Sequence, residues 1–367
     1  MMKFSPTEPG RKTDYISAEI ERRIMDGIWK VGDRLPIDIE LAATFRCSVG
    51  TLGKAIDRLK QNGMLERRPR IGTRVIHASP RRKTALELNT YAFIYPSEKH
   101  EGIRRIIDGF QEAAYESTRR TLMIPILDAR KEAETLAHLS ELDVKGAVVF
   151  PVLLNPEDQV YYMQMLLACP FPVVLAGVNL IGVRRPTVIL DGIHAGYTMT
   201  RHLLKQGLQR IGYLGNYAWV SSGRDRYLGY LQAMSEAGLE ARTEDVCLEP
   251  SQHPDYENLL NEPARLARRY LEARPRLEGV VCSNDFLACG CLLAAREMGL
   301  PVPARLKVTG IDGFRTLPSD LPPLTTYRTP FEEIGKKAFA ALVTTAEGNA
   351  EHGETMVRGS LVLGESA

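Results

Sequence analysis

The chain has 367 residues, of which 44% are apolar and 25% charged, a composition typical of a globular protein of two or three domains. No apolar run approaches the roughly 20 residues that cross a bilayer, and the first residues lack the apolar core of a signal peptide. The six cysteines form no CxxC pair and the seven histidines form no ligand cluster. We therefore expect a cytoplasmic protein with no membrane partner, no metal and no cofactor.

Charge is divided unevenly along the chain. Residues 1–84 hold 18 Lys and Arg against 10 Asp and Glu, a net charge of +8, and the remainder carries −6. A basic segment on an acidic body favours a polyanionic partner for that segment alone. A solvated charged face is the alternative that charge by itself leaves open.

The N-terminal residues predict three helices in sequence. Apolar residues recur at helical spacing over 15–26, and Gly27 is expected to end that helix. Pro36 is placed to open a second helix, and Ser48 is placed to cap a third that Asn62-Gly63 ends. The expected inward-facing residues of the second and third helices are Ile39, Leu41, Ala42, Phe45, Leu52, Ile56 and Leu59.

Two short strands are expected next, at 64–68 and 73–77, on either side of a basic turn at 69–72. Three helices followed by a basic hairpin predict a winged helix-turn-helix over residues 1–77. Residues 78–89 predict a linker. Its basic run at 81–83 either adds phosphate contacts or forms a solvated hinge.

The winged helix resembles the GntR family of bacterial regulators from Tyr15 to His77. The shared motifs are I-x-x-G at 24–27, G-D-R-L-P at 32–36, E-L-A at 40–42 and G-T-x-V at 72–75. The resemblance implies a double-stranded DNA operator as partner. The residues that it implies for DNA contact are Arg34, Ser48, Thr51, Lys54, Arg70, Gly72 and Arg74.

The third helix departs from that family. Val49 and Gly53 occupy positions where the family usually carries arginines, and Gly50 adds a second glycine. Each glycine inside a helix costs about 1 kcal/mol relative to alanine. A close approach of the backbone to DNA, a divergent operator and a loss of specific binding are the three interpretations that we consider.

Residues 90–367 alternate short apolar runs with amphipathic helices, which predicts parallel sheets covered on both faces. The length favours two lobes. The predicted strands are 91–95, 122–126, 146–150, 172–176, 187–190, 211–214, 279–282 and 307–311. The predicted helices are 102–117, 131–140, 193–206, 224–238 and 285–298.

Ligands of open parallel sheets bind beyond the carboxyl ends of the strands. Polar residues follow several predicted strands, including Ser97, Asp191, Asn216 and Asp312. Such groups exchange hydrogen bonds with ligand hydroxyls, and an aromatic ring at 217 or 219 is suited to stack on a sugar. The structural alternatives are that Asp285 caps its helix, Asp191 makes a turn and Trp219 only packs.

This second segment resembles the ligand-binding domain of the lac repressor family, which is similar to periplasmic sugar-binding proteins, over about 260 residues. The matching stretches begin at Asp191, His202, Arg226, Ser283, Val302, Val308 and Leu321. The resemblance carries the family's effector contacts to Arg226, Asn284 and Asp312. Gly313 and a shortened loop at 97–102 depart from the family, which leaves the first-lobe contacts open.

The expected fold is α/β, with an N-terminal winged helix-turn-helix followed by a two-lobed periplasmic-binding-protein-like domain, the domain order of arabinose-repressor-like regulators. We predict a homodimeric, ligand-responsive repressor of a sugar-utilisation operon, whose effector binds between the lobes. The predicted effector residues are Ser97, Trp219, Arg226, Asn284 and Asp312. Sensing of a purine or nucleoside, and sugar binding without specific DNA recognition, are the alternatives. No GxSxG, HExxH or pyridoxal-binding lysine motif favours an enzyme.

Overall fold

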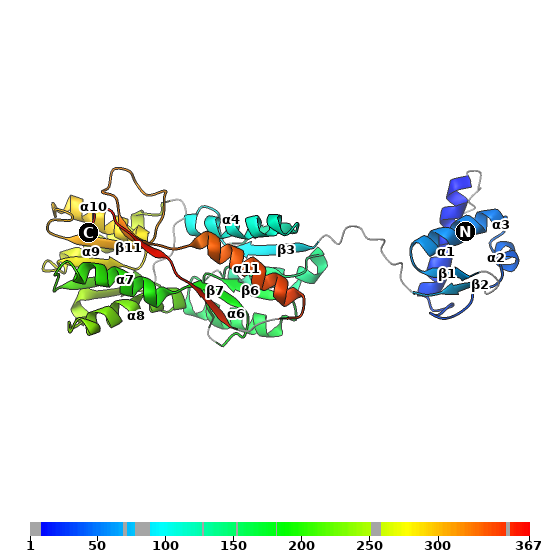
Figure 1. Cartoon of the computed structure of the whole chain (residues 1–367), viewed down its shortest axis with the longest axis horizontal. Coiled ribbons are helices and arrows are strands. Elements are labelled where there is room, and N and C mark those ends of the chain that lie inside the picture. The colour runs from blue at the N-terminus through cyan, green and yellow to red at the C-terminus, as the bar shows by residue number, and fades with distance from the viewer. Residues whose placement is uncertain are drawn as a thin grey trace. The chain divides into compact units, whose positions relative to one another are not determined.

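The computed structural model contains two compact units, residues 1–88 and 89–367 (Figure 1). It describes residues 9–68, 72–77, 89–126, 128–151, 153–180, 182–250, 258–349 and 353–367. Arg70 and nearly all of the predicted linker lie outside the described residues. In the described part of the chain, no helix is long and apolar enough to cross a membrane, and no cluster of metal-binding side chains occurs.

The N-terminal unit is a winged helix-turn-helix, as predicted. Its elements are α1 (Pro9–Met25), α2 (Asp38–Thr44), α3 (Val49–Gln61), β1 (Leu65–Arg68) and β2 (Gly72–Val75). The two strands pair antiparallel. One apolar core joins the inward faces of the helices to the hairpin, because Ile20 of α1, Ile56 of α3 and Val75 of β2 are all buried in it.

The boundaries of α3 follow from its capping residues. Ser48 Oγ accepts a hydrogen bond of 3.1 Å from the backbone N–H of Thr51, which satisfies one donor of the first turn. Gly63 adopts a φ of +71° just beyond the last turn, a conformation that glycine adopts without strain. Both predicted ends of this helix are confirmed.

The predicted start of α2 is wrong by two residues. The helix begins at Asp38 because the chain before it runs beside the wing, where the Leu35 N–H donates to the carbonyl of Thr73. The predicted inward position of Ile39 is also wrong. Only the second turn of α2, at Leu41 and Ala42, enters the core, and Ile39 remains 71% exposed.

The C-terminal unit consists of two lobes, each built on a six-stranded sheet. Lobe 1 has the sheet order β13-β7-β6-β5-β3-β4, with all pairs parallel. Its strands are β3 (Thr90–Tyr95), β4 (Arg120–Pro125), β5 (Ala147–Val149), β6 (Val173–Ala176), β7 (Thr187–Leu190) and β13 (Glu354–Val357). Its helices are α4 (Glu101–Glu116), α5 (Ala129–Ala137), η1 (Leu139–Leu142), α6 (Pro156–Ala168) and α11 (Phe331–Ala346).

Lobe 2 has the sheet order β14-β12-β11-β10-β8-β9, in which only the edge strand β14 is antiparallel. Its strands are β8 (Ile211–Asn216), β9 (Val246–Glu249), β10 (Gly279–Cys282), β11 (Lys307–Asp312), β12 (Thr325–Arg328) and β14 (Ser360–Val362). Its helices are α7 (Gly192–Leu204), α8 (Ser221–Glu236), η2 (Thr243–Asp245), α9 (Asn261–Glu272) and α10 (Asp285–Glu297). The chain crosses between the lobes at 190–192, 328–331 and 357–360, so the predicted two-lobed α/β fold is confirmed.

Glycines bring α7 and α8 into backbone contact. A Cβ added to Gly196 would lie 1.9 Å from the carbonyl oxygen of Arg226, and one added to Gly229 would lie 2.1 Å from that of Ile193. No side chain other than hydrogen fits at these distances. The two glycines therefore fix the position of α8, and with it the position of Arg226.

We expect Gly196→Ala to lower the free energy of unfolding of the C-terminal unit by about 1–3 kcal/mol, because the added methyl group forces the helices apart. Thermal denaturation of the full chain measures the effect. Gly353→Ala is the control, since an added Cβ there meets nothing within 4 Å. Equal melting temperatures for the two variants would contradict the close packing of α7 on α8.

Candidate functional site

A cavity of about 270 Å³ lies between the two lobes of the C-terminal unit. Its wall includes Phe150 after β5, Asn216 at the end of β8, Asn284 after β10 and Asp312 at the end of β11. The cavity thus lies at the carboxyl ends of the parallel strands, where open α/β sheets bind their ligands.

Arg226 and Asp312 form an ion pair in the lobe 2 wall. Arg226 Nη2 donates to Asp312 Oδ1 at 2.9 Å, and Nη1 donates to the carbonyl of Ser283. The third guanidinium nitrogen, Arg226 Nε, is buried and has no hydrogen-bond partner among the described residues. Thr329 Oγ1 is likewise buried without a partner in the described chain. Both residues line the cleft.

The amide side chains of the same wall orient one another. Asn284 Nδ2 donates to Asn216 Oδ1 at 2.9 Å, and Asn284 Oδ1 accepts from the backbone N–H of Leu287 at 2.9 Å. Asn284 is therefore the N-cap of α10. The alternative that Asp285 caps this helix is wrong, because its neighbour already fills that position.

Asp285 instead holds the segment that follows β11. Its Oδ2 accepts from the Phe314 N–H at 2.9 Å, and its Oδ1 accepts from the hydroxyl of Thr326. Burial, together with the nearby Asp312, raises the pKa of Asp285 to about 7. Burial also raises the pKa of Asp312 to about 6, although Arg226 opposes this shift. The charge of Asp312 thus disfavours ionisation of Asp285, and Arg226 stabilises the charged form of Asp312.

Two predicted effector residues do not lie on the cleft wall. Ser97 Oγ accepts from the backbone N–H of Lys99 at 3.2 Å, within its own turn. Trp219 Nε1 donates to the carbonyl of Pro250 at 3.2 Å, and its ring packs edge-on against Tyr217. The structure brings Arg226, Asn284 and Asp312 together on the wall, and it places Tyr217 rather than Trp219 beside them.

The described lobe 1 residues of the wall are apolar, with one exception. The aliphatic and aromatic part includes Ile103, Phe150, Leu153 and Val178, and His100 is the only polar side chain among these residues. The cleft therefore offers a ligand a polar side on lobe 2 and an apolar side on lobe 1. Sequence reasoning missed this difference, because no polar motif marks an apolar wall.

His100 is the N-cap of α4 and touches both lobes. Its Nδ1 accepts from the Ile103 N–H, which requires the unprotonated nitrogen. Its ring lies edge-on to those of Phe286 and Phe314, which belong to lobe 2, with centroids 5.7 and 5.4 Å away. Desolvation by these neighbours lowers the pKa of His100 to about 4.

We expect the stability of the C-terminal unit to fall as the pH drops from 6.5 toward 4. Over this range the unfolded chain binds a proton at His100 that the folded chain excludes, so the free energy of unfolding decreases by about 1–2 kcal/mol at pH 5. Denaturant unfolding of wild type and His100→Asn across this range measures the effect, since asparagine retains a capping acceptor. Identical pH profiles for the two proteins would contradict the depressed pKa.

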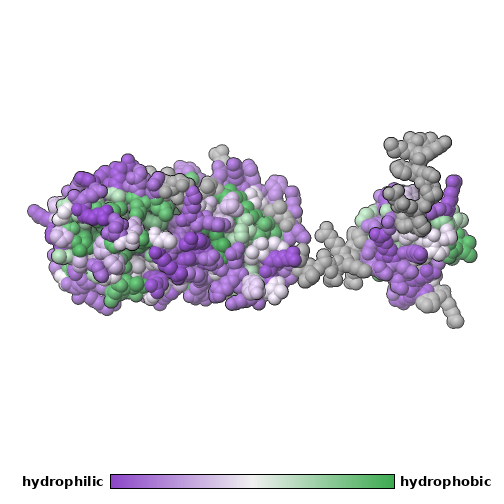
Figure 2. Space-filling view, turned by 90° about the horizontal axis from the view of Figure 1, so that it is seen from above, coloured by the Kyte–Doolittle hydropathy of each residue, from purple (hydrophilic) through white to green (hydrophobic). Residues whose placement is uncertain are grey.

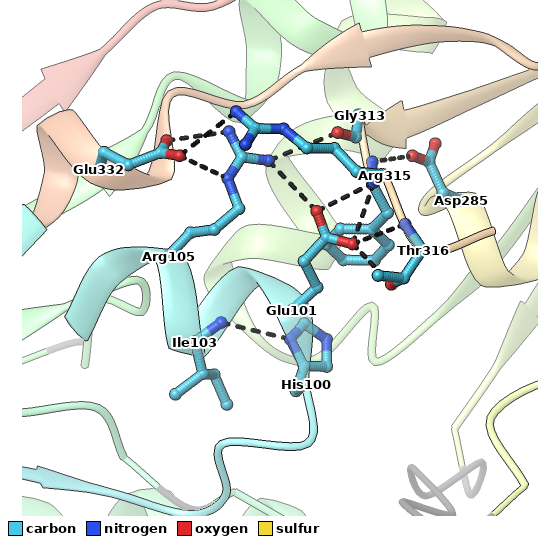
Figure 3. A network of polar contacts seen from close by, with 10 residues as sticks. His100, Glu101, Ile103, Arg105, Asp285, Gly313, Arg315, Thr316 and Glu332 are labelled. Carbon is cyan, nitrogen blue, oxygen red and sulfur yellow. Dashed lines mark hydrogen bonds and ion pairs between the residues drawn. The ribbon is translucent and has the colours of Figure 1, made fainter. Parts of the chain in front are cut away.

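A second polar network joins the lobes beside the cleft (Figure 3). The buried carboxylate of Glu101 in α4 accepts hydrogen bonds of 2.9 Å from the N–H groups of Arg315 and Thr316, and another from the Thr316 hydroxyl. Arg105, one turn along α4, forms two parallel hydrogen bonds with Glu332 at 2.8 and 2.9 Å. Lobe 1 thereby holds the segment that follows β11 of lobe 2.

The network also determines the ionisation state of Glu101. Burial alone would raise the pKa of Glu101, but the hydrogen bonds from Thr316 and Arg315 and the charge of Arg105 outweigh burial, and the pKa is lowered. Glu101 is therefore an anion at neutral pH. No local sequence signal pairs residue 101 with residues 315 and 316.

The predicted DNA-binding residues of the N-terminal unit are mostly exposed. Arg34, Lys54 and Arg74 are exposed. The backbone of Arg34 pairs with that of Arg74 in the wing through an isolated antiparallel β-bridge. Gly72 adopts a φ of +97° at the start of β2. The Ser48 and Thr51 hydroxyls lie 2.8 Å apart at the cap of α3.

Comparisons with known proteins match both units. Residues 12–75 match the model of the gntR family of bacterial regulatory proteins, and residues 200–367 match the periplasmic binding protein-like domain. The arabinose metabolism transcriptional repressor of Geobacillus stearothermophilus is 27% identical over 367 residues, which cover 96% of each chain. The repressor PurR of Pectobacterium carotovorum is 33% identical over 157 residues, 43% of this chain and 44% of that protein.

Solved structures of low sequence identity share the fold. A LacI family regulator from Mycobacterium smegmatis has a TM-score of 0.64 at 24% identity, over 76% of this chain and 98% of that one. The CelR–cellobiose complex has a TM-score of 0.66 at 20% identity, over 91% of this chain and 100% of that one. The chain therefore joins a helix-turn-helix domain of the gntR family of bacterial regulatory proteins to a periplasmic binding protein-like domain, and it is a homologue of an arabinose metabolism repressor.

Proposed function

We propose that this protein is a ligand-responsive transcriptional repressor of a sugar-utilisation operon. The observation that carries the proposal is the combination of a winged helix-turn-helix with a cleft in which Arg226 Nε and Thr329 Oγ1 are buried without partners among the described residues. Buried polar atoms without partners are costly, and a ligand with suitably placed oxygen atoms satisfies them. A DNA-binding unit attached to such a cleft is suited to regulation rather than catalysis.

In this proposal Arg226, Asn284 and Asp312 bind the effector, and Thr329 is added to them. Arg226 and Thr329 offer hydrogen bonds to hydroxyl or carbonyl oxygens, and the carboxylate of Asp312 accepts from a hydroxyl. If Asp312→Ala left ligand-dependent changes in operator affinity intact, this assignment would be wrong.

A purine or nucleoside effector is the second candidate, and the apolar lobe 1 wall favours it. A free sugar carries hydroxyls around its whole rim, and those facing Ile103, Phe150 or Leu153 find no polar side chain there. A ring with one polar edge and an apolar face fits both walls. Differential scanning fluorimetry with pentoses, hexoses, nucleobases and nucleosides separates the two classes.

The proposed mechanism is a shift between two populations. The effector binds the closed arrangement of the lobes better than the open one, and that difference in affinity changes the geometry of a homodimer on the operator. A dimer is proposed because paired half-sites require two DNA-binding units. A cytoplasmic location and the absence of enzymatic activity belong to the same proposal.

Three exposed basic side chains are expected to contact phosphates directly, namely Arg34, Arg74 and, in α3, Lys54. Ser48, Thr51 and Gly72 complete the proposed DNA surface, together with Arg70 outside the described residues. The test is binding of the purified full chain to duplex fragments from its own locus, across a range of salt concentrations. Binding that weakens steeply with salt supports the proposal, and failure to bind any such fragment at low salt contradicts it.

A further inference from the structure

The outward face of the first two turns of α3 has an unusual composition for a surface that contacts DNA. Leu52, Ala55 and Ile56 face the core, so the positions of these turns that do not face it are 49, 50, 51, 53 and 54. They hold an exposed valine, two glycines, a half-buried threonine and one lysine. Lys54 is the only charged side chain in these turns, and an acid, Asp57, follows in the third.

The hydroxyl groups at the start of α3 already form hydrogen bonds within the helix cap. The hydroxyls of Ser48 and Thr51 lie within hydrogen-bond distance of each other, and Ser48 Oγ also accepts from the Thr51 N–H. Beside them the Val49 side chain is 46% exposed. Figure 2 shows hydrophobic surface at one edge of the N-terminal unit. An apolar group thus occupies the position from which a recognition helix contacts base edges.

Packing within the domain does not require the two glycines beside Val49. A Cβ added to Gly53 meets nothing within 4 Å, and one added to Gly50 meets only Ser48 Oγ, at 3.9 Å. Neither residue has a positive φ. Alanine would fit at both positions and would favour the helix, so the domain retains glycine at a cost to its own stability. A surface without Cβ atoms allows another molecule to approach the helix backbone closely.

We propose that Val49 recognises the C5-methyl groups of thymine in the major groove, and that Gly50 and Gly53 allow α3 to approach the base edges. The inference rests on the proposed function. The partner is duplex DNA because exposed cations of the same unit, Arg34, Lys54 and Arg74, match its phosphates, while the apolar face matches the one apolar group that the major groove presents. The preferred half-site is therefore rich in thymine where α3 enters the groove.

The experiment begins with selection of binding sites by the full chain from a random duplex library. Each selected thymine is then replaced in turn by uracil, which removes only the methyl group. We expect the replacement to lower affinity about fourfold at each contacted position, as burial of one methyl group predicts. In Val49→Ala, the loss of affinity caused by replacing thymine with uracil should disappear at one position. Val31→Ala, which truncates a valine outside α3 that is even more exposed than Val49, should retain the loss of affinity at every position.

Gly53→Ala gives an independent readout. We expect it to raise the unfolding temperature of the N-terminal unit and to lower operator affinity about fivefold or more, the cost typical of one disturbed base contact. If Gly53 only supported the domain structure, its substitution would change the unfolding temperature and the operator affinity in the same direction. Equal affinity for thymine and uracil sites, or unchanged operator affinity in Gly53→Ala, overturns this inference without contradicting the proposed repressor function. Failure to select any sequence contradicts the proposed function instead.

Discussion

Arg226→Ala is expected to lower the free energy of unfolding of the C-terminal unit by about 3–5 kcal/mol at neutral pH, the cost typical of removing one partner from a buried ion pair. The substitution leaves the Asp312 carboxylate without its counter-charge and close to Asp285. It also removes the donor to the Ser283 carbonyl. Denaturant unfolding of the full chain measures the change.

The pH dependence of Arg226→Ala separates lost charge pairing from lost packing. Burial already raises the pKa of Asp312 to about 6, and loss of the guanidinium raises it further. Protonated Asp312 carries no charge for Arg226 to neutralise. The difference in free energy of unfolding between the wild type and the variant should therefore decrease as the pH falls from 8 to 5. Arg224→Ala, which removes a half-exposed pairing with Asp225, should cost less than about 1 kcal/mol. Similar losses in the two variants, independent of pH, would contradict the buried pair.

Glu101→Ala is expected to cost about 3–5 kcal/mol, since it removes the single acceptor of several hydrogen bonds to a charged group. The N–H groups of Arg315 and Thr316 then lose their partner on lobe 1. Their amide protons should exchange with solvent faster than in the wild type, which mass spectrometry of the full chain detects.

Two matched variants control the Glu101 experiment. Glu101→Gln keeps one acceptor oxygen and should lose about half as much stability. Glu112→Ala breaks an exposed ion pair between α4 and α11 and should lose less than about 1 kcal/mol. Because the pKa of Glu101 is lowered, its contribution is present above pH 4.5 and is lost below it. Unchanged exchange at residues 315 and 316 in Glu101→Ala would show that the network does not hold the lobes together.

Much of the fold follows from the sequence because its central strands are short, continuous apolar runs. All eight predicted strands are present, from β3 to β11. The sequence reading missed β9, β12, β13 and β14, whose alternating or threonine-rich residues lie at or near sheet edges. It also missed α6, α9 and α11. The crossing at 328–331 returns the chain to lobe 1, and local periodicity does not encode such a return.

The candidate site is only partly predictable from sequence for a related reason. Arg226, Asn284 and Asp312 lie on the cleft wall because they follow strands or begin helices, and that position is visible in the sequence. Ser97 follows a strand too, but its hydroxyl bonds within its own turn. Thr329 and Glu101 gain their significance from groups that the crossing segments and the contacts between the lobes bring together.

Control of the winged helix by the cleft is tested most directly by a titration of a labelled duplex from the protein's own upstream region with the full chain. The titration is performed with and without a compound that raises the unfolding temperature of the C-terminal unit, and fluorescence anisotropy gives the affinity. We expect salt-sensitive binding, whose affinity the compound changes in the wild type and not in Asp312→Ala. Operator affinity that no stabilising compound changes would contradict the central claim that the cleft controls the winged helix.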